Sequence, residues 1–301
     1  MHELAPKDRT LLIDLKDFRF QLNSFPCNGS SPLLLLVLVT SAPGNLENRR
    51  TIRETWRRGF RHIIFLIGAV ESRAVQAALE EESRTYRDLV QGSFLDSYRN
   101  LTYKHVMALK WTAYYCPDAR YLLKVDDDVF VNPPVLLDFL SQDLSPWGAR
   151  RLILCENLIF QFVNRSLKSK WRVSPQEYPG EMYPPRCRGW VVLYSQDVVF
   201  LLYREAQRTQ YFWIEDVHVT GTLAARANLT QASLRKLMLS REQVKQLLDS
   251  RDNGSGIGVF VFGYSDMPLL EIRRLWQMVQ DRRPTSTQAG LQEQNPQVSS
   301  C

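Results

Sequence analysis

The segment Lys124-Val125-Asp126-Asp127-Asp128-Val129-Phe130-Val131-Asn132 decides both the fold of this chain and the place of its chemistry. The apolar run at 121–123 before it predicts a buried strand, and three carboxylates follow where that strand ends. Isolated buried charge is costly, so these acids need a partner. Hard cations such as Mn2+ and Mg2+ take carboxylate and phosphate oxygens, and open α/β sheets bind ligands beyond the carboxyl ends of their strands. The segment therefore predicts a metal-assisted enzyme that acts on a phosphorylated, nucleotide-linked substrate.

Runs of aspartate also occur in proteins without this chemistry. Most such runs are solvated loops or turns, and some Asp-rich loops bind Ca2+. The segment lacks the glycine-containing loop ending in Glu that an EF-hand requires. The choice between a solvated loop and a metal site therefore depends on the rest of the chain.

The composition is that of a globular protein with a mild excess of positive charge. The chain has 301 residues, of which 45% are hydrophobic, enough for one large domain or two ordinary ones. Its 38 Lys and Arg against 32 Asp and Glu give a net charge of +6, which suits an anionic ligand or a membrane-rich compartment. The sequence has no dense basic tract of the kind that nucleic-acid binding favours, so we expect no nucleic-acid partner.

Two features indicate the secretory pathway. The first is a set of five Asn-X-Ser/Thr glycosylation triplets, at Asn28, Asn100, Asn164, Asn228 and Asn253. The second is five cysteines with no CxxC pair and no zinc spacing, at Cys27, Cys116, Cys155, Cys187 and Cys301. A lumenal protein could pair four of them. Connectivity does not follow from the sequence, and our working hypothesis joins Cys116 to Cys187.

No segment of the sequence predicts a membrane span. The best candidate, 33–39, is far shorter than the roughly 20 residues that cross a bilayer. Asp8, Asp14 and Asp17 interrupt the apolar residues at the start, so no signal peptide is predicted. If the protein is lumenal, either an anchor is missing from this chain or entry follows another route.

Strand and helix patterns alternate along the chain, which predicts an α/β sheet with helices on both faces. We expect strands at 33–39, 63–67, 121–125 and 191–193, and helices at 49–58, 71–84, 101–115, 135–140, 196–204, 241–248 and 269–281. Residues 1–31 are expected to form a stem or lead-in, 32–281 a single catalytic domain, and 282–301 a disordered polar tail. The absence of GxGxxG, GxxxxGK[ST] and GxSxG motifs disfavours dinucleotide, P-loop and hydrolase chemistry.

A second acidic constellation, Glu215-Asp216-Val217, follows the aromatic cluster Tyr211-Phe212-Trp213. Aromatic rings stack on sugar faces, and a carboxylate in an apolar setting is a good base for a hydroxyl proton. An acidic pair at a helix N-terminus without chemistry is the alternative. A third element is rich in Pro and aromatic residues, at 170–174, 177–179 and 183–185, and suits either a sugar-site wall or a self-packed surface loop.

Taken together, these motifs resemble the beta-1,3-glycosyltransferases of glycosyltransferase family 31. The resemblance runs from Leu33 to Gln280 and keeps the motifs in the family's order. They are RRTIRETW at 49–56, FLIG at 65–68, DSYRNLTYK at 96–104, KVDDDVFVN at 124–132, KWRVS at 170–174 with EYP at 177–179, EDV at 215–217, and the segment at 268–276. Any one motif is weak, but so many in order are specific.

The resemblance implies a GT-A type fold, a Rossmann-like mixed sheet flanked by helices. It also implies an inverting, Mn2+- or Mg2+-assisted transfer of a hexose from a UDP-sugar to a 3-hydroxyl of a glycoprotein or glycolipid glycan. UDP-galactose is the favoured donor and UDP-N-acetylglucosamine the alternative. The family further implies a Golgi-lumenal type II membrane protein, whose anchor this chain does not show.

The resemblance also assigns roles to individual residues. Asp216 would be the base, and Asp128 with Asp126 would hold the metal. The nucleotide-sugar would lie among Arg49, Arg53, Asp96, Lys104, Asp126 and Asp127. The acceptor side would be formed by Trp171, Tyr178 and Glu215.

Three departures from the family pattern motivate a different class, a non-catalytic relative that binds nucleotide-sugar or glycan. Val191 and Thr220 stand where the family has glycine. The segment 261–265 lacks a histidine that many relatives carry there, and we expect the chain's own histidines to be mostly structural, with His218 the one that could enter the site. Against this class stand the intact acidic motifs.

Overall fold

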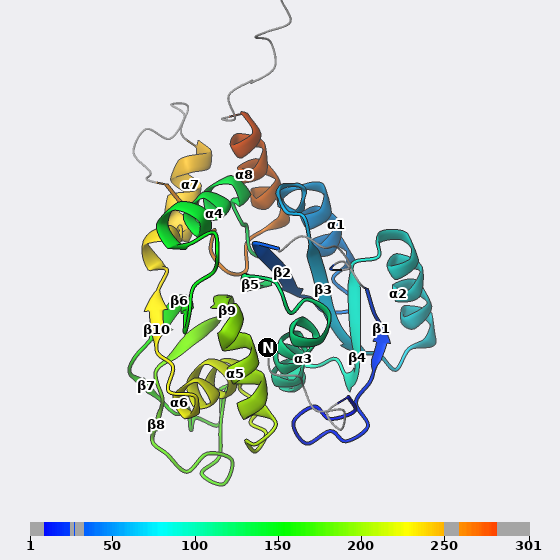
Figure 1. Ribbon diagram of the computed structural model, residues 1–301, viewed down its shortest axis with the longest axis vertical. Helices are drawn as coiled ribbons and strands as arrows, with labels where there is room; N and C mark the ends of the chain where they lie inside the picture. Colours follow the sequence, from blue (N-terminus) through cyan, green and yellow to red (C-terminus); the bar gives the residue numbers. More distant parts are fainter. Residues whose placement is uncertain (1–8, 25–26, 28–32, 250–258, 282–301) are drawn as a thin grey trace, which may run out of the picture.

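The computed structural model describes residues 9–24, 27, 33–249 and 259–281. Their centre is an eight-stranded sheet of order β1-β4-β3-β2-β5-β9-β6-β10 (Figure 1). The strands are β1 (Phe20–Leu22), β2 (Leu35–Thr40), β3 (Ile63–Ala69), β4 (Leu89–Leu95), β5 (Tyr121–Asp126), β6 (Ile153–Leu158), β9 (Arg186–Ser195) and β10 (Gln231–Ser233). A separate two-stranded sheet pairs β7 (Gln161–Phe162) with β8 (Met182–Tyr183).

The sheet changes direction at β5. Strands β4, β3, β2 and β5 are parallel, whereas β9 runs antiparallel to β5 on its other side. The outer strands β1 and β6 are antiparallel to β4 and β9, and β10 is parallel to β6. The mixed α/β sheet expected from the sequence is therefore confirmed, and the acidic segment lies at its switch point, where such sheets bind ligands.

Both faces of the sheet are buried, because β2 alternates its side chains between two apolar cores. Leu35, Val37 and Val39 belong to one core, and Leu36 with Leu38 to the other. The first core is covered by α1 (Leu46–Glu54), α2 (Arg73–Tyr86), α4 (Pro133–Asp138), α7 (Arg241–Asp249) and α8 (Leu269–Asp281). The second is covered by α3 (Leu101–Tyr115), α5 (Gln196–Ala206) and α6 (Ala224–Arg226). Such continuous burial explains why the central strands are apolar runs rather than alternating ones.

Short helical segments complete the chain. They are η2 (Trp56–Gly59), η3 (Tyr98–Asn100), η4 (Phe139–Leu144), η5 (Val217–Leu223) and η6 (Arg235–Leu237), of which η4 and η5 are π-helical. Of the helices covering the second core, α3 is buried on nearly every side, because it lies against the sheet, α5 and the chain before residue 25. No helix in the described part of the chain is long and apolar enough to cross a membrane.

Residues 9–24 and 27, the described part of the segment expected as a stem or lead-in, contribute to the folded body. Strand β1 extends the sheet, and Phe18 is buried in the second core. The Trp111 indole donates to the Asn23 side chain at 2.7 Å. The expected tail at 282–301 lies outside the described residues.

Two disulfides correct the working pairing of Cys116 with Cys187. The structure joins Cys27 to Cys116, tying the N-terminal segment to α3, and Cys155 to Cys187, tying β6 to β9. The hypothesis failed because the pairing depends on which strands are neighbours, and sequence spacing does not carry that information. Cys301 lies outside the described residues.

Candidate active site

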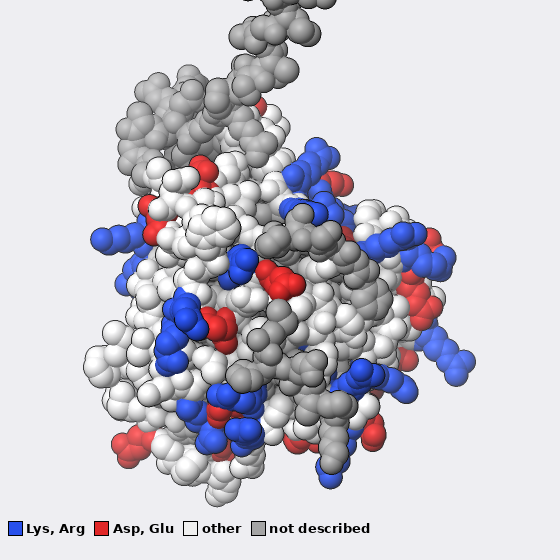
Figure 2. All heavy atoms as spheres, viewed as in Figure 1, with Lys and Arg blue, Asp and Glu red and all other residues white. Residues whose placement is uncertain are grey.

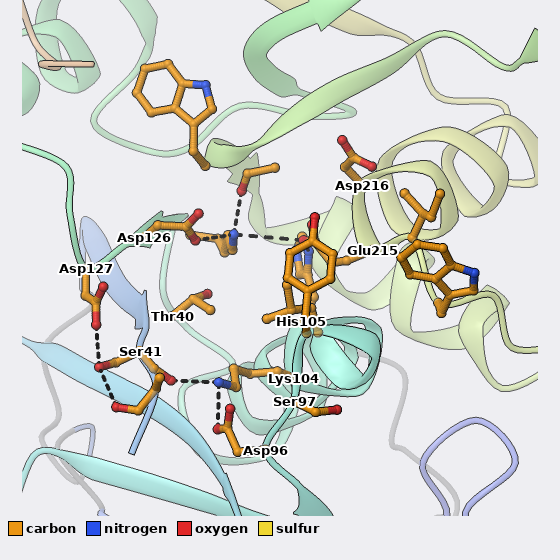
Figure 3. Close-up of a pocket in the computed structure, with 18 of the residues that line it drawn as sticks. Thr40, Ser41, Asp96, Ser97, Lys104, His105, Asp126, Asp127, Glu215 and Asp216 are labelled. Carbon is orange, nitrogen blue, oxygen red and sulfur yellow. Dashed lines mark hydrogen bonds and ion pairs between the residues drawn. The ribbon is translucent and has the colours of Figure 1, made fainter. Parts of the chain in front are cut away.

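A pocket of about 1290 Å³ opens at the switch point of the sheet. It is lined by the ends of β2 and β5, the start of α3, the middle of β9 and the segment before η5. Figure 3 shows Asp126 and Asp216 on different sides of this cavity, with Lys104 and Asp96 at its floor. The pocket is large enough for a nucleotide-sugar with part of a second sugar.

The three aspartates after β5 have different surroundings. Asp127 is buried and fixed: its carboxylate accepts hydrogen bonds from Ser41 Oγ at 2.6 Å and from the Asn45 amide at 3.0 Å. Asp126 and Asp128 line the pocket without neutral side-chain donors: Asp126 is paired with a lysine, and Asp128 accepts from backbone N–H groups only. Asp127 therefore orders the loop after β2, and its two neighbours remain for a ligand.

Asp126 pairs with a buried lysine. Lys124 Nζ lies 2.7 Å from Asp126 Oδ1, 3.9 Å from Glu215 Oε1, and donates to the Gly189 carbonyl. Burial lowers the Lys124 pKa, but the charges of Asp126 and Glu215 outweigh it and raise the pKa, so the lysine is a cation. Burial raises the pKa of Asp126 to about 7, because one lysine shared between two carboxylates offsets only part of the desolvation.

Asp128 lies in a more acidic setting. Burial raises its pKa, and the charges of Asp127 and Asp266 raise it further. Asp266 is a residue that the sequence analysis did not single out, and its backbone donates a hydrogen bond to the Asp128 carboxylate. A cation bound here would relieve this repulsion.

The charge around the pocket fits a bound dication. Of the described residues that line it, seven are acidic and four are basic: Glu71, Asp96, Asp126, Asp127, Asp128, Glu215 and Asp216 against Lys104, Lys124, Arg186 and Arg188. An anionic diphosphate would be repelled by this lining unless a cation came with it. Hard oxygen donors from one or two carboxylates are the usual protein ligands of Mn2+ and Mg2+ beside phosphates. Within the described chain, however, no group of three or more His, Cys, Asp or Glu forms a ready-made metal site, so substrate oxygens would have to complete the coordination.

Asp216 lies on another side of the pocket, with its carboxylate held at both oxygens. It precedes η5, where Oδ1 accepts the Val217 N–H at 2.8 Å and Oδ2 pairs with the Arg186 guanidinium. Burial raises the Asp216 pKa to about 6; Arg186 opposes this shift and Glu215 adds to it. The carboxylate is thus ionised at neutral pH and more basic than an ordinary aspartate.

Glu215 is held in place by a buried network. His105 Nδ1 contacts its carboxylate, and His105 Nε2 lies 3.0 Å from the Tyr194 hydroxyl. Burial would raise the Glu215 pKa, but Lys124 and His105 lower it below its ordinary value. A Cβ on Gly189 would meet Glu215 Oε2 at 2.5 Å, so a larger residue at that point of β9 would have to displace the Glu215 carboxylate. Glu215 therefore acts as a fixed negative charge between the two sides of the pocket.

Asp96 and Lys104, which the resemblance places around the nucleotide-sugar, form the pocket floor. Lys104 Nζ lies 2.8 Å from Asp96 Oδ2 and donates to the Ser41 carbonyl at 2.6 Å. Burial lowers the Lys104 pKa, and the charge of Asp96 opposes the shift. Asp96 also accepts the Gly68 N–H at 2.6 Å, which joins β3 to the floor.

Two arginines expected around the nucleotide-sugar lie elsewhere in the described structure. Arg49 pairs with Glu82 at 2.7 Å and donates to the carbonyls of Ala42 and Pro43. Arg53 pairs with Glu82 and with Asp88 at 2.7 Å. Neither is among the described lining residues. The expectation is corrected: Arg49 shapes the loop that lines the pocket, and Arg53 ties α1 to α2 and β4.

Of the three residues expected on the acceptor side, Trp171 and Glu215 line the pocket and Tyr178 does not. Trp171 lines the pocket, and its indole donates to the Tyr98 hydroxyl at 2.6 Å. Tyr178 does not belong to the described lining; it packs against Tyr183 and Phe212 in a small core beneath. The aromatic cluster expected beside the acidic pair contributes Trp213 to the lining. The sequence analysis assigned no role to five other residues that line the pocket, Tyr98, Phe162, Trp190, Arg186 and His105.

The departures from the family pattern are accommodated locally. Val191 is fully buried opposite Val125 in the central sheet. Thr220 donates to the Asp216 carbonyl at 2.7 Å and accepts the Cys187 N–H at 3.0 Å. His218 lies outside the described lining, and burial lowers its pKa to about 4, so it is neutral.

Three of the glycosylation triplets lie in the described chain. Asn228 is exposed, Asn100 is half-buried and donates to the Leu95 carbonyl, and Asn164 lines the pocket. Asn28 and Asn253 lie outside the described residues.

Comparison with known proteins assigns the chain to a family. A family model described as Galactosyltransferase matches residues 47–235. The chain belongs to the galactosyltransferase family. It is 34% identical to beta-1,3-galactosyltransferase 5 of Gorilla gorilla gorilla over 76% of this chain and 78% of that protein. It is 37% identical to beta-1,3-galactosyltransferase 2 of Mus musculus over 66% of this chain.

The coverage of these relatives differs. The match spans 48% of the Mus musculus protein, so the chain covers about half the length of that relative. A Sus scrofa UDP-GalNAc:beta-1,3-N-acetylgalactosaminyltransferase 1 is 34% identical over 68% of this chain and 63% of that protein. Among solved structures, the galactosyltransferase LgtC, determined with donor and acceptor sugar analogues, aligns with 81% of this chain and 95% of its own at 12% identity and a TM-score of 0.41. At that distance the likeness carries no functional conclusion.

Proposed function

We propose that this galactosyltransferase-family member is an inverting beta-1,3-glycosyltransferase of GT-A type that moves galactose from UDP-galactose to a 3-hydroxyl of a glycan. The observation that carries the proposal is the arrangement of two acidic groups around one pocket. Asp126 and Asp128 follow β5 on one side, and Asp216, with a pKa of about 6, lies on another. The first pair suits a diphosphate with its cation, and the second suits a hydroxyl nucleophile.

On the donor side, Asp128 and Asp126 would hold Mn2+ or Mg2+. When bound, such a cation neutralises the charge that develops on the departing diphosphate. The protein's own part is to fix the diphosphate site: Asp127 orders the loop after β2, and Lys104 with Asp96 forms its floor.

On the acceptor side, Asp216 takes the proton of the attacking hydroxyl. Arg186 holds the carboxylate against β9 and keeps its pKa low enough for ionisation at neutral pH. Attack from the face opposite the leaving group inverts the anomeric centre. Trp171 lines the same pocket and its exposed ring can stack on a sugar, whereas Trp213 is buried behind it.

The compartment we propose is the Golgi lumen. Two disulfides support it, because disulfides persist in oxidising compartments, and so do the glycosylation triplets. The protein would then belong to the type II membrane proteins of the secretory pathway.

The test is release of UDP and formation of a glycosidic bond with Mn2+ and a panel of galactose- and N-acetylgalactosamine-terminated acceptors. UDP-galactose, UDP-N-acetylglucosamine and UDP-N-acetylgalactosamine are compared as donors, the last because of the Sus scrofa relative. We expect transfer from UDP-galactose and a β-1,3 linkage by NMR. A protein that binds UDP with Mn2+ but transfers no sugar to any acceptor would be the non-catalytic relative instead.

A further inference from the structure

The β7–β8 hairpin and the two residues before it expose a concentration of large apolar side chains. Phe160, Phe162 and Leu167 are 76%, 75% and 79% exposed. Three further apolar residues of the same segment, Ile159, Trp171 and Met182, are also exposed. Phe162 and Met182 are cross-strand partners, so part of the set is contiguous across the hairpin. Clusters of this kind on a protein surface mark sites of interaction.

Hydrogen bonds fix the conformation of the loop that carries Leu167 and Trp171. The Val173 N–H donates to the Asn164 carbonyl at 2.8 Å and closes residues 164–173 into a loop. Arg165 donates to the carbonyls of Val173, Tyr178 and Gly180 at 2.8–3.0 Å. A buried cluster that includes Val163, Val173 and Trp213 lies beneath. The loop therefore cannot turn its apolar side chains inward without breaking these contacts.

The tip of this loop is basic as well as apolar. Residues 166–172 contain Lys168, Lys170 and Arg172, all exposed, and no acidic residue. Lys170 Nζ lies 4.5 Å from the centre of the Trp171 ring. Lysine, arginine and tryptophan beside aliphatic side chains suit the headgroup region of an anionic bilayer, where rings and aliphatic groups enter the lipid and cations meet phosphates.

The surface continues into the candidate active site. Gln161, Phe162 and Trp171 line the pocket. In Figure 2 the lower left of the molecule, where Figure 1 places β7 and β8, shows uncharged surface beside groups of Lys and Arg and a few acidic side chains. A bilayer on this surface would thus adjoin the side of the pocket that we assign to the acceptor.

We propose that residues 159–172 dock this protein on an anionic lipid bilayer and present its pocket to glycans carried by lipids in that bilayer. The docking itself follows from the surface, and the acceptor class rests on the proposed glycosyltransferase function. An acceptor sugar alone would use the ring faces of Phe162 and Trp171, but it has no use for Leu167 and Ile159, which lie outside the described pocket lining. A glycan on Asn164 would hold the loop away from lipid, so Asn164 stays unmodified in the docked protein.

The test is sedimentation of the full chain with phosphatidylcholine vesicles, with and without phosphatidylserine. We expect binding to the anionic vesicles that weakens as salt is added. The double variant Phe160→Ser/Leu167→Ser should lower partitioning at least roughly tenfold, since two large apolar side chains leave the lipid. Lys168→Glu should lower it on the order of tenfold on anionic vesicles and little on neutral ones. The matched controls Trp147→Ser/Leu270→Ser and Lys245→Glu change exposed residues elsewhere and should bind as the unaltered protein does.

Activity separates this proposal from the proposed function. The same oligosaccharide is offered free in solution and linked to a lipid in anionic vesicles. We expect Phe160→Ser/Leu167→Ser to slow transfer to the lipid-linked form only. Failure of all transfer would overturn the enzyme assignment and leave the vesicle result standing.

Three outcomes would overturn the docking proposal. The first is absence of vesicle binding by the unaltered chain. The second is a dimer in sedimentation velocity that the double variant dissolves, which would make this surface a contact between copies of the chain. The third is a glycan on Asn164 in every molecule of a protein that still binds vesicles through Leu167. Mass spectrometry of the peptide that contains Asn164 measures this occupancy.

Discussion

The acidic segment after β5 and the acidic pair before η5 each bury neighbouring carboxylates, and each stabilises them with different partners. In each, one carboxylate is held by several side chains: Asp127 by Ser41 and Asn45, and Glu215 by His105 and Lys124. The neighbour of each, Asp126 or Asp216, keeps one charged partner and has a pKa raised by burial. Adjacent acids of the same charge thus divide into a positioning residue and a reactive one, and the division depends on the contacts rather than on the residue type.

The largest effect should come from the reactive member of the second region. Asp216→Asn removes the base while keeping the size of the side chain. We expect kcat/KM to fall by roughly 100- to 10,000-fold. Asp143→Asn, at an exposed position in η4, is the matched control and should retain full activity. Unchanged turnover in Asp216→Asn would assign the base to another group.

The metal site that we propose for the first region is tested by binding, at Asp128, the acid on the other side of Asp127. Asp128→Ala should weaken binding of UDP with Mn2+ by about 10- to 100-fold in calorimetry, because a metal ligand is lost. Binding of UDP without the metal should change little. Asp143→Ala serves as the control. Equal affinity of Asp128→Ala and the unaltered protein for UDP with Mn2+ would remove the metal from the donor side.

The positioning member of the first region should affect stability more than chemistry. Asp127→Asn leaves the donors of Ser41 and Asn45 without their charged acceptor in a buried place. We expect the free energy of unfolding to fall by about 1–3 kcal/mol in urea titrations, with KM for the donor raised by the disordered loop. If Asp127→Asn keeps full stability and loses all turnover, Asp127 takes part in the reaction and does not merely position the loop.

The dependence of kcat/KM on pH tests whether the raised pKa of Asp216 controls the reaction. The base is active as the carboxylate, so kcat/KM should fall about tenfold per pH unit below a pH of about 6. Arg186 lowers this pKa, so Arg186→Gln should move the acid limb upward by about one unit. A limb that stays in place would mean that Asp216 does not control the profile.

The smallest effect should come from Thr220, which stands where the family has glycine. Thr220→Gly removes the buried hydrogen bond from the Cys187 N–H, which joins η5 to β9, and the hydroxyl's bond to the Asp216 carbonyl at the start of η5. We expect a loss of about 1–2 kcal/mol in the free energy of unfolding and unchanged kcat. A gain in kcat would show that the threonine impairs the reaction.

The sequence predicted the mixed α/β class and most of the central elements because their residues are strongly patterned. Helix α8 has the bounds expected, and β5 differs by one residue. Strands β4 and β6 were missed. Strand β4 contains Gln91 and Gly92, and β6 contains Glu156 and Asn157, residue types that are depleted in strands or neutral there. Their place in the sheet comes from tertiary pairing.

The sequence analysis placed Asp126, Asp128 and Asp216 in the site, and these carboxylates do line the pocket. It also placed Arg49 and Arg53 there, and these side chains instead form ion pairs within the protein. Nothing near Arg49 in the sequence shows that Glu82 pairs with it, so the family resemblance alone placed this arginine beside the nucleotide-sugar. His105 and Arg186 carried no local signal at all. Their partners, Glu215 and Asp216, are 110 and 30 residues away.

The strand order has a consequence for synthesis of the chain on the ribosome. Strands β1 to β5 occupy one side of the sheet and come from residues 20–126, whereas β9, β6 and β10 are added after β5 on the other side. Until residue 195 has emerged, β5 is an open edge that ends in three aspartates. An open apolar edge is prone to pair with another chain. The charges at its end would then oppose such pairing in the nascent protein, before they have any substrate to meet.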